Sequence, residues 1–165
     1  CKFIFMPIYY TPASQFMTEA KNDIAKDAVY YGCDGFDGID TAVQGFDIST
    51  IPQEVSFLSH FNSKSTEGAS GEFIRKYTEK YGADSLSQFG ASAYDCVYAI
   101  YGAMKEAGDK ISVTSSASDI CDALKEVFGS GYTYSGVTGT DIKWTSDGFV
   151  SKAALKYIVK ESDAK

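Results

Sequence analysis

The chain has 165 residues, of which 44% are hydrophobic and 22% are charged, a composition typical of a folded globular protein rather than a disordered one. Its net charge of -7 argues against nucleic acid, which requires a basic surface, and against binding through a basic membrane-surface patch. The four cysteines form no CxxC motif and His60 is the single histidine, so a structural zinc site is not expected. We therefore expect neither a metal nor a cofactor.

The first predicted unit is a strand, a loop and a helix. Residues 3–6 are all apolar and are stopped by Pro7, which indicates a strand buried on both faces, as in a parallel sheet. Tyr9 and Tyr10 belong to an aromatic turn, and residues 14–21 are predicted to form a helix. In open α/β sheets ligands bind beyond the carboxyl ends of the strands, which is where this loop lies.

The same pattern then repeats. Residues 29–31 are predicted to form a second strand, and residues 32–38 form the loop that follows it. If the two strands are neighbours, Tyr9 and Asp34 point into one cleft. Asp34 lies between two glycines, where the backbone can come close to a ligand, although aspartate between glycines is also common in ordinary turns.

A third strand and three helices are predicted in the middle of the chain. The strand covers residues 54–61, and the helices cover residues 71–81, 88–107 and 116–128, the last with Ser118 as its cap. In the longest helix an apolar face is formed at helical spacing by Phe89, Ala93, Val97, Ile100 and Met104. Helices of this kind normally cover a sheet, and few strands lie between them, so part of the sheet is expected to lie outside the chain.

Two other residues of the longest helix have simple structural interpretations. Asp95 is predicted to be a helix charge that faces solvent or a neighbouring loop, and Cys96 is predicted to be a small buried hydrophobe. After the glycine-rich residues 129–139, a strand at residues 140–144 and a returning strand at 153–159 are predicted to form a hairpin.

Several stretches together carry a resemblance to a known family. The loop Pro7–Tyr10, paired with the loop at residues 32–36, resembles the second lobe of the leucine/isoleucine/valine-type amino-acid-binding proteins, the solute receptors of ATP-driven uptake systems. Residues 73–82, residues 93–98, and residues 136–139 followed by Gly148 occur in the order found in that family. The resemblance covers nearly the whole chain.

This resemblance implies an α/β fold of the type I periplasmic-binding-protein kind, present only in part, with a Rossmann-like parallel sheet and flanking helices. It places residues 1–62 in lobe two, residues 63–139 among the helices of lobe one, and residues 140–165 in a hairpin that returns to lobe two. It also implies that the fold is completed by the N-terminal half of the same protein or by a swapped second copy. Cys1 runs straight into a strand instead of the polar tether that follows an acylated lipoprotein cysteine, so we expect the chain to begin inside a larger protein.

The resemblance also implies a function. The protein would be extracytoplasmic, in the periplasm or lipid-anchored at the cell surface, and would close two lobes around an amino acid, branched-chain or similar, before recognition by a membrane permease. It places ligand contacts at Tyr9 and Asp34, with Asp34 paired to the ammonium group and Tyr9 offering a hydroxyl and a π surface. Tyr10 and Phe36 are further candidates to line the pocket. The alternative is a sensing domain of the same fold that signals to a partner protein.

An enzyme is the third class considered. His60 could act as a base, but no nucleophile stands at a recognisable spacing from it, and the sequence has neither a G-x-S-x-G elbow nor a paired-carboxylate motif. We therefore expect a binding protein and not a catalyst.

Overall fold

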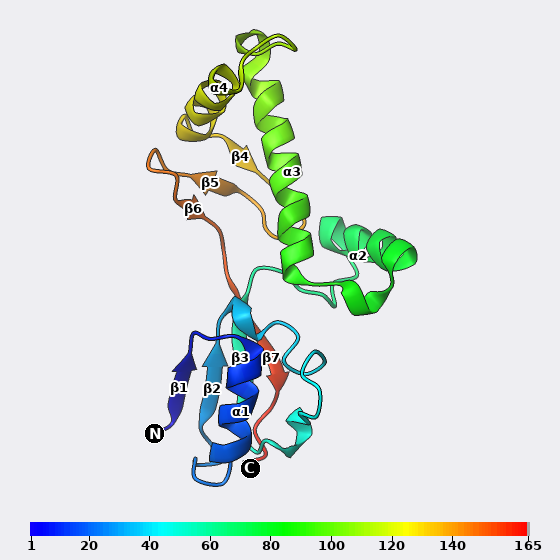
Figure 1. Ribbon diagram of the computed structural model, residues 1–165, viewed down its shortest axis with the longest axis vertical. Helices are drawn as coiled ribbons and strands as arrows, with labels where there is room; N and C mark the ends of the chain where they lie inside the picture. The colour runs from blue at the N-terminus through cyan, green and yellow to red at the C-terminus, as the bar shows by residue number, and fades with distance from the viewer. Residues whose placement is uncertain (165) are drawn as a thin grey trace. The chain divides into compact units, whose positions relative to one another are not determined.

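The computed structural model describes residues 1–164, and the chain divides into two compact units (Figure 1). Unit 1 comprises Cys1–Ser59 together with the segment that begins at Ala154, and unit 2 comprises His60–Ala153. The chain therefore leaves unit 1 after Ser59 and re-enters it at Ala154.

Unit 1 is built on a four-stranded sheet. Its strands are β1 (Phe3–Met6), β2 (Val29–Gly32), β3 (Glu54–Ser59) and β7 (Leu155–Lys160), in the spatial order β1-β2-β3-β7. The first three strands are parallel, whereas β7 is antiparallel to β3 with an irregularity between Val55 and Ser56. The apolar run at residues 3–6 forms a strand of a mostly parallel sheet, as predicted, but the prediction that it is buried on both faces is wrong for the described chain, because β1 is an edge strand with Phe3 and Phe5 exposed.

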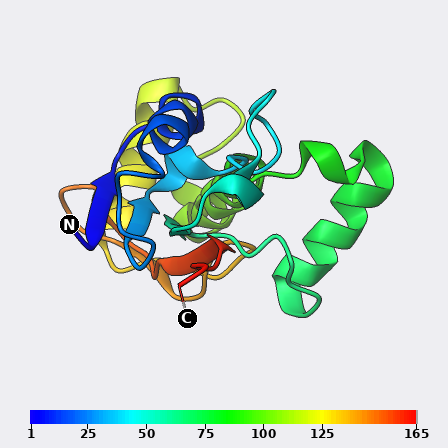
Figure 2. The ribbon, with the colours of Figure 1, turned by 90° about the horizontal axis from the view of Figure 1, so that it is seen from below.

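One face of this sheet carries the core of unit 1. Helix α1 (Tyr10–Ala20) connects β1 to β2 and lies on one side of the strands, as the view along them shows (Figure 2). The core on this side is formed by Met6, Ala13, Met17, Tyr30, Phe36, Ile39, Ile51, Val55 and Phe57. The short 3-10 helices η1 (Asp34–Phe36) and η2 (Ile48–Thr50) lie in the connection from β2 to β3. Gln53 fastens this connection, because its buried amide nitrogen donates to the carbonyl oxygens of Lys21 and Ile24 at 2.9 and 2.8 Å.

Unit 2 is dominated by three helices, α2 (Gly68–Tyr81), α3 (Gln88–Ala107) and α4 (Ala117–Gly129). Single turns of 3-10 helix, η3 (Ala83–Ser85) and η4 (Gly108–Lys110), follow α2 and α3. Small side chains let α3 and α4 pack closely, with Ala103 and Ala107 buried against Ala123 and Val127. A second small core joins Phe61, Ala91 and Val137, with Phe73 of α2 packed against it.

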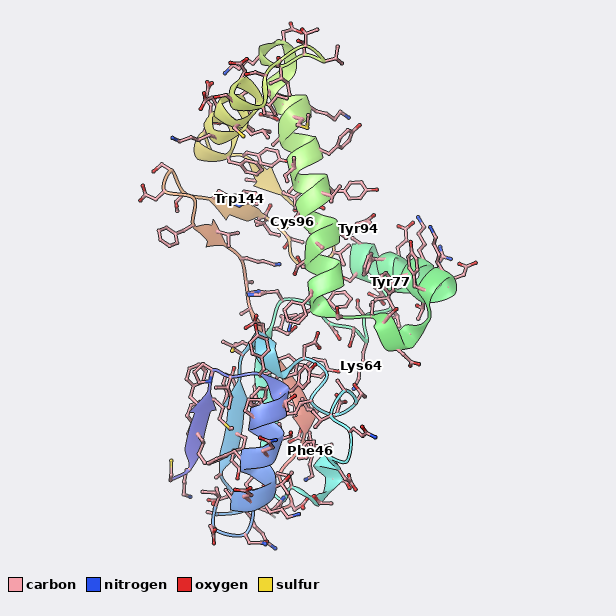
Figure 3. All side chains as sticks on the ribbon, viewed as in Figure 1. Phe46, Lys64, Tyr77, Tyr94, Cys96 and Trp144 are labelled. Atoms are coloured by element: carbon pink, nitrogen blue, oxygen red, sulfur yellow. The ribbon has the colours of Figure 1, made fainter. Side chains whose placement is uncertain are left out.

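A three-stranded antiparallel sheet completes unit 2. It consists of β4 (Thr133–Tyr134), β5 (Ile142–Trp144) and β6 (Val150–Ser151), in that order. Trp144 joins this sheet to α4, since its ring lies 4.8 Å from that of Phe128 and 6.0 Å from that of Tyr132 (Figure 3).

The predicted pairing of the last two strands is wrong. Residues 142–144 pair with β6 and not with the strand at residues 155–160, which instead joins β3 in the other unit. The tight turn itself is present, because the amide of Gly148 donates to the carbonyl of Thr145, and Gly148 adopts a positive φ of 85°. Alternation of apolar residues predicts a strand but does not specify its partner.

The longest helix has two stripes. The predicted apolar stripe, with Phe89, Val97, Ile100 and Met104, is exposed in the described chain, which agrees with the expectation that part of the fold lies outside the chain. The stripe that the chain buries consists of Ala91, Asp95, Ala99, Ala103 and Ala107. The prediction that Cys96 is buried is wrong, because Cys96 lies next to the buried stripe and not on it (Figure 3). All four cysteines are free thiols.

The boundaries of three helices differ from those predicted, and one of them, α2, begins at Gly68 and not at residue 71. Helix α1 begins at Tyr10, four residues earlier than expected, with Pro12 in its first turn, where a missing amide hydrogen costs nothing. Helix α4 is capped by Ser116 and not by Ser118: the Ser116 hydroxyl accepts from the amide of Asp119, whose carboxylate accepts in return from the amide of Ser116.

Candidate ligand-binding site

The candidate site lies beyond the carboxyl ends of the strands in the sheet of unit 1. Strands β1 and β2 are parallel neighbours, so the loops that follow them, at residues 7–9 and 33–37, start at the same end of the sheet. The pairing of Met6 with Gly32 brings the last residues of the two strands side by side. This is the position at which open α/β sheets bind ligands.

The two loops touch each other through their backbones. A Cβ atom added to Gly35 would lie 2.7 Å from the carbonyl oxygen of Ile8 and 3.2 Å from the Cα atom of Tyr9. Only glycine fits at such an approach. The residue after Asp34 is therefore packed against the residue before Tyr9, and the loop carrying Asp34 lies against the loop carrying Tyr9.

Tyr9 and Asp34 are both on the surface of unit 1. Tyr9 is the residue that precedes helix α1, and its side chain is 70% exposed while its carbonyl oxygen accepts from the amide of Ala13. Asp34 opens the 3-10 turn η1, and its carbonyl oxygen accepts from the amide of Asp37 at 3.1 Å. An aromatic ring with a hydroxyl and a carboxylate thus extend from adjoining loops.

Tyr10 and Phe36 are placed differently. The Phe36 side chain is 0% exposed: its ring covers Gly32 and lies 6.5 Å from that of Phe57. Tyr10 is half-buried and packs against the same core. Both residues anchor the loops to the core of unit 1. A contact of either residue with a ligand stays a prediction.

The two loops of unit 1 carry residue types that attract an ammonium group, a carboxylate at Asp34 and an aromatic ring at Tyr9. A carboxylate forms strong, charge-assisted hydrogen bonds with an ammonium group, and an aromatic face attracts the same charge. Within residues 1–164, no group of three or more His, Cys, Asp or Glu side chains is placed to hold a metal ion. The same part of the chain contains no helix long and apolar enough to cross a membrane.

A buried polar network in unit 2 was not expected from the sequence. Asp95 is buried, and its carboxylate accepts from the amides of Val137 and Thr138 at 2.8 and 2.7 Å. It also accepts from the hydroxyls of Thr138 at 2.6 Å and Tyr134 at 3.1 Å. The signal in the sequence was the spacing of Asp95, which falls four residues from both Ala91 and Ala99 in a stripe of small side chains.

A lysine lies close to the carboxylate of Asp95. The ammonium group of Lys152 donates to the Thr138 hydroxyl at 2.6 Å, so one hydroxyl links the lysine to the carboxylate. Burial lowers the pKa of Lys152, and the negative charge of Asp95 opposes that change. Burial first, and then the charge of Asp95, raise the pKa of Tyr134, which therefore keeps its proton and donates a hydrogen bond to the carboxylate. The network fixes α3 to the loop before β5 and is structural.

A cavity of about 690 Å³ lies between α2, α3 and residues 134–137. Its wall is a chain of aromatic rings: Phe73 lies 4.9 Å from Tyr94, and Tyr94 lies 4.6 Å from Tyr98. Tyr77 extends the chain along α2, and Tyr94 belongs to α3 (Figure 3). Glu72 and Lys76 in this wall pair with each other at 2.7 Å, so the cavity offers an aromatic surface more than a charged one.

No protein-family model and no curated protein matches the sequence. The fold, however, matches solved structures of substrate-binding proteins. The leucine-binding protein LivK of Thermotoga maritima has a TM-score of 0.71 at 20% identity, with 96% of this chain and 41% of that chain covered.

Two further matches have a bound amino acid in their structures. The substrate-binding protein LivJ of Streptococcus pneumoniae, in complex with isoleucine, has a TM-score of 0.66 at 23% identity and covers 99% of this chain and 42% of that chain. A substrate-binding protein of Desulfitobacterium hafniense, in complex with Leu, has a TM-score of 0.68 at 14% identity and covers 96% and 41%.

These matches confirm the predicted fold class. The chain has part of the type I periplasmic-binding-protein fold, with a mainly parallel sheet and flanking helices, and the predicted structural resemblance to branched-chain amino-acid receptors is confirmed. The chain spans about 41% of the length of the first of these proteins.

Proposed function

We propose that this chain is part of a two-lobed solute-binding protein of an ABC uptake system that binds an amino acid, branched-chain or similar, outside the cytoplasm. Unit 1 belongs to lobe two and unit 2 belongs to lobe one. The proposal is supported by the fold and by its likeness to receptors whose structures hold isoleucine or leucine.

The observation that carries the proposal is the contact between the two loops at the carboxyl ends of β1 and β2. Because Gly35 packs against Ile8, Asp34 and Tyr9 extend from adjoining loops on the surface. A free amino acid presents an ammonium group that a carboxylate and an aromatic face both attract. We assign the ammonium to Asp34 and the adjoining wall to Tyr9, and we place Tyr10 and Phe36 behind them.

An amino acid also presents a carboxylate, which needs hydrogen-bond donors. We assign those donors to the remainder of lobe one, provided by an N-terminal half of the same protein or by a swapped second copy. Closure of the two lobes would complete the site and create the surface that a membrane permease recognises. The chain by itself then holds half of the site.

The half site can be tested on the chain as it is. L-Leucine is titrated into isotopically labelled protein while the backbone amide resonances are followed. We expect saturable shifts at the residues around Tyr9 and Asp34, with a Kd on the order of 1 mM, which corresponds to about 4 kcal/mol of binding free energy. Because the ammonium is the recognised group, 4-methylpentanoate, which is leucine without its amino group, should produce no shifts at these loops.

Matched variants separate a site from a general effect of added solute. Asp34→Asn removes the charge and is expected to abolish the leucine-dependent shifts. Asp40→Asn removes an exposed carboxylate a few residues away and is expected to leave them unchanged. Shifts that survive in Asp34→Asn, or that 4-methylpentanoate reproduces, would contradict the assigned role of Asp34.

A further inference from the structure

The chain passes between the two units twice within the described residues. The first crossing joins Ser59 to His60, and the second joins Ala153 to Ala154. In unit 1 both crossings adjoin a paired ladder, because Ser59 of β3 pairs with Leu155, the first residue of β7. Any motion between the units therefore changes the backbone torsion angles of these few residues.

One side chain joins the two crossings at the border of unit 2. The Nδ1 atom of His60 lies 3.0 Å from the carbonyl oxygen of Ala153, so the first residue of unit 2 is hydrogen-bonded to its last. A carbonyl oxygen can only accept, and hence Nδ1 is the nitrogen that carries the proton in the neutral ring. His60 is half-buried, and it is the single histidine of the chain.

Each crossing is also anchored inside unit 2 by the residue next to this hydrogen bond. Phe61 is buried and packs with Ala91 and Val137 in a small core. Lys152 donates from its ammonium group to the hydroxyl of Thr138 at 2.6 Å. Two consecutive residues of one loop, Val137 and Thr138, thus hold one anchor from each crossing.

The loop that holds both anchors is itself fixed to two helices. The carboxylate of Asp95 in α3 accepts from the amides of Val137 and Thr138 at 2.8 and 2.7 Å. The hydroxyl of Ser70 in α2 donates to the carbonyl oxygen of Val137 at 2.5 Å. The anchors therefore end on a part of unit 2 whose backbone is hydrogen-bonded on both sides.

These contacts close into a ring. The His60 hydrogen bond leads to Ala153 and its neighbour Lys152, and Lys152 leads to the loop at residues 137–138. The same loop leads back through Phe61 to His60. Within this ring the His60 hydrogen bond is the link that joins the two crossings directly. Without it each crossing is held by its own anchor alone.

We infer that His60 is a positioning residue that couples the two crossings into one hinge. With its hydrogen bond in place the crossings leave unit 2 at a fixed separation and bend together, whereas without it they act as two separate linkers. Hinge closure belongs to the proposed function, but its control by an imidazole outside both ligand loops does not. The test uses the chain without ligand, so failure at His60 and failure of amino-acid binding at Asp34 are distinguishable.

The tautomer of the imidazole provides the first test. A long-range proton–nitrogen correlation spectrum of the 165-residue chain, recorded in mildly alkaline solution, shows which nitrogen of the single imidazole is protonated. We expect Nδ1. Lys152→Met removes the anchor of the second crossing and should move the proton in part to Nε2, because Ala153 then leaves the imidazole more often. Lys143→Met, at an exposed lysine of β5, should leave the tautomer unchanged.

The order of the backbone provides the second test. Nitrogen relaxation should give order parameters of about 0.85, the value of a rigid backbone, at residues 60–61 and 152–153. His60→Leu removes the hydrogen bond and should lower the order parameter of Ala153 to below about 0.6. The melting temperature should hardly change, because a single exposed hydrogen bond contributes little to stability. His60→Asn places an amide nitrogen close to the position of Nδ1 and should restore the rigid value.

The coupling of the crossings is measured on the two units. Residual dipolar couplings give the strength of alignment of each unit, and the two strengths should differ more in His60→Leu than in the unaltered chain or in His60→Asn. A proton on Nε2 in the unaltered chain, or a tautomer that Lys152→Met does not change, would overturn the inference. Alignment and order parameters that are the same in His60→Leu and the unaltered chain would overturn it as well.

Discussion

Gly35 packs against the backbone of Ile8 so closely that an added Cβ atom would lie 2.7 Å from the Ile8 carbonyl oxygen. Backbone atoms cannot give way as the end of a flexible side chain can. This contact therefore fixes the distance between the loops that follow β1 and β2, and with it the position of Asp34 next to Tyr9.

The first prediction concerns this contact. Gly35→Ala should separate the two loops and lower the free energy of unfolding of unit 1 by about 1–3 kcal/mol, as overpacking does. Leucine-dependent shifts at Tyr9 and Asp34 should weaken in the same variant. The matched control is Gly129→Ala, because a Cβ atom at Gly129 meets nothing within 4 Å and the substitution should be nearly neutral. Thermal unfolding of both variants provides the measurement, and equal melting temperatures would contradict the role of Gly35.

The second prediction concerns the buried carboxylate of unit 2. Asp95→Asn replaces one acceptor oxygen with an amide group that faces a backbone amide of Val137 or Thr138. Losing a buried, charge-assisted network should lower the free energy of unfolding by about 3 kcal/mol. Urea unfolding followed by the fluorescence of Trp144, the single tryptophan, reports on unit 2. Asp84→Asn, at an exposed carboxylate, is the control, and a loss no larger than its loss would show that the network contributes little.

The third prediction distinguishes the observed helix cap from the one the sequence suggested. Ser116 caps α4 through a reciprocal pair with Asp119, so Ser116→Ala should cost about 1 kcal/mol of stability. Ser118→Ala is a matched substitution two residues farther along the chain, and it should have almost no effect. The two variants are compared by Trp144 fluorescence in urea, and a larger effect at Ser118 would reverse the assignment.

The local elements of the fold were predictable because each has a local cause. The apolar run at residues 3–6, the glycine that ends α2 at Gly82 and the long periodic pattern of α3 are signals contained in short windows. The adjacency of the Tyr9 and Asp34 loops was predictable too, because neighbouring parallel strands have their carboxyl ends at the same end of the sheet. The closeness of that contact depends on Gly35 and could not be read from the pattern.

The wrong strand pairing and the unexpected buried stripe of α3 share a physical origin, since each concerns a choice of partner. The strand at residues 155–160 could have paired with residues 142–144, but it pairs with β3, nearly 100 residues earlier in the chain. Helix α3 has two apolar stripes, and periodicity cannot say which of them a given part of the chain covers. Its small-residue stripe is covered by α4 and the loop before β5, because alanine permits close approach, while its large residues stay exposed.

The fourth prediction follows from these two stripes. Val97 is exposed, so Val97→Lys should change the stability of the chain by no more than about 0.5 kcal/mol. Ala99 is buried on the opposite stripe, so Ala99→Leu should destabilise it by about 1–3 kcal/mol. Trp144 fluorescence in urea measures both. The reverse order of effects would show that the stripe of large residues is the one that this chain buries.

The last prediction is a pH dependence that arises from Glu54 and Lys156. The hydrogen bond from Lys156 holds the pKa of Glu54 below its ordinary value of 4.5, although partial burial opposes it. The same hydrogen bond raises the pKa of Lys156 above 10.5. A carboxyl pKa that is lowered on folding stabilises the folded state above pH 4.5, and this stabilisation is lost as the pH falls through the folded-state pKa. A lysine pKa that is raised on folding stabilises the folded state below pH 10.5, and this stabilisation is lost as the pH rises through the folded-state pKa. The pair therefore contributes between these limits.

Glu54→Gln tests this contribution directly. At neutral pH the variant should be less stable by about 0.5–1 kcal/mol, a small value because the Lys156 side chain is 46% exposed and solvent screens the pair. Below the folded-state pKa of Glu54 both proteins carry an uncharged group at position 54, so the difference should disappear in acid. Urea unfolding followed by circular dichroism at the two pH values measures it, with the exposed Glu19→Gln as the control. A difference that persists in acid would assign the effect to packing or to the hydrogen bond with Ser56 instead of to charge.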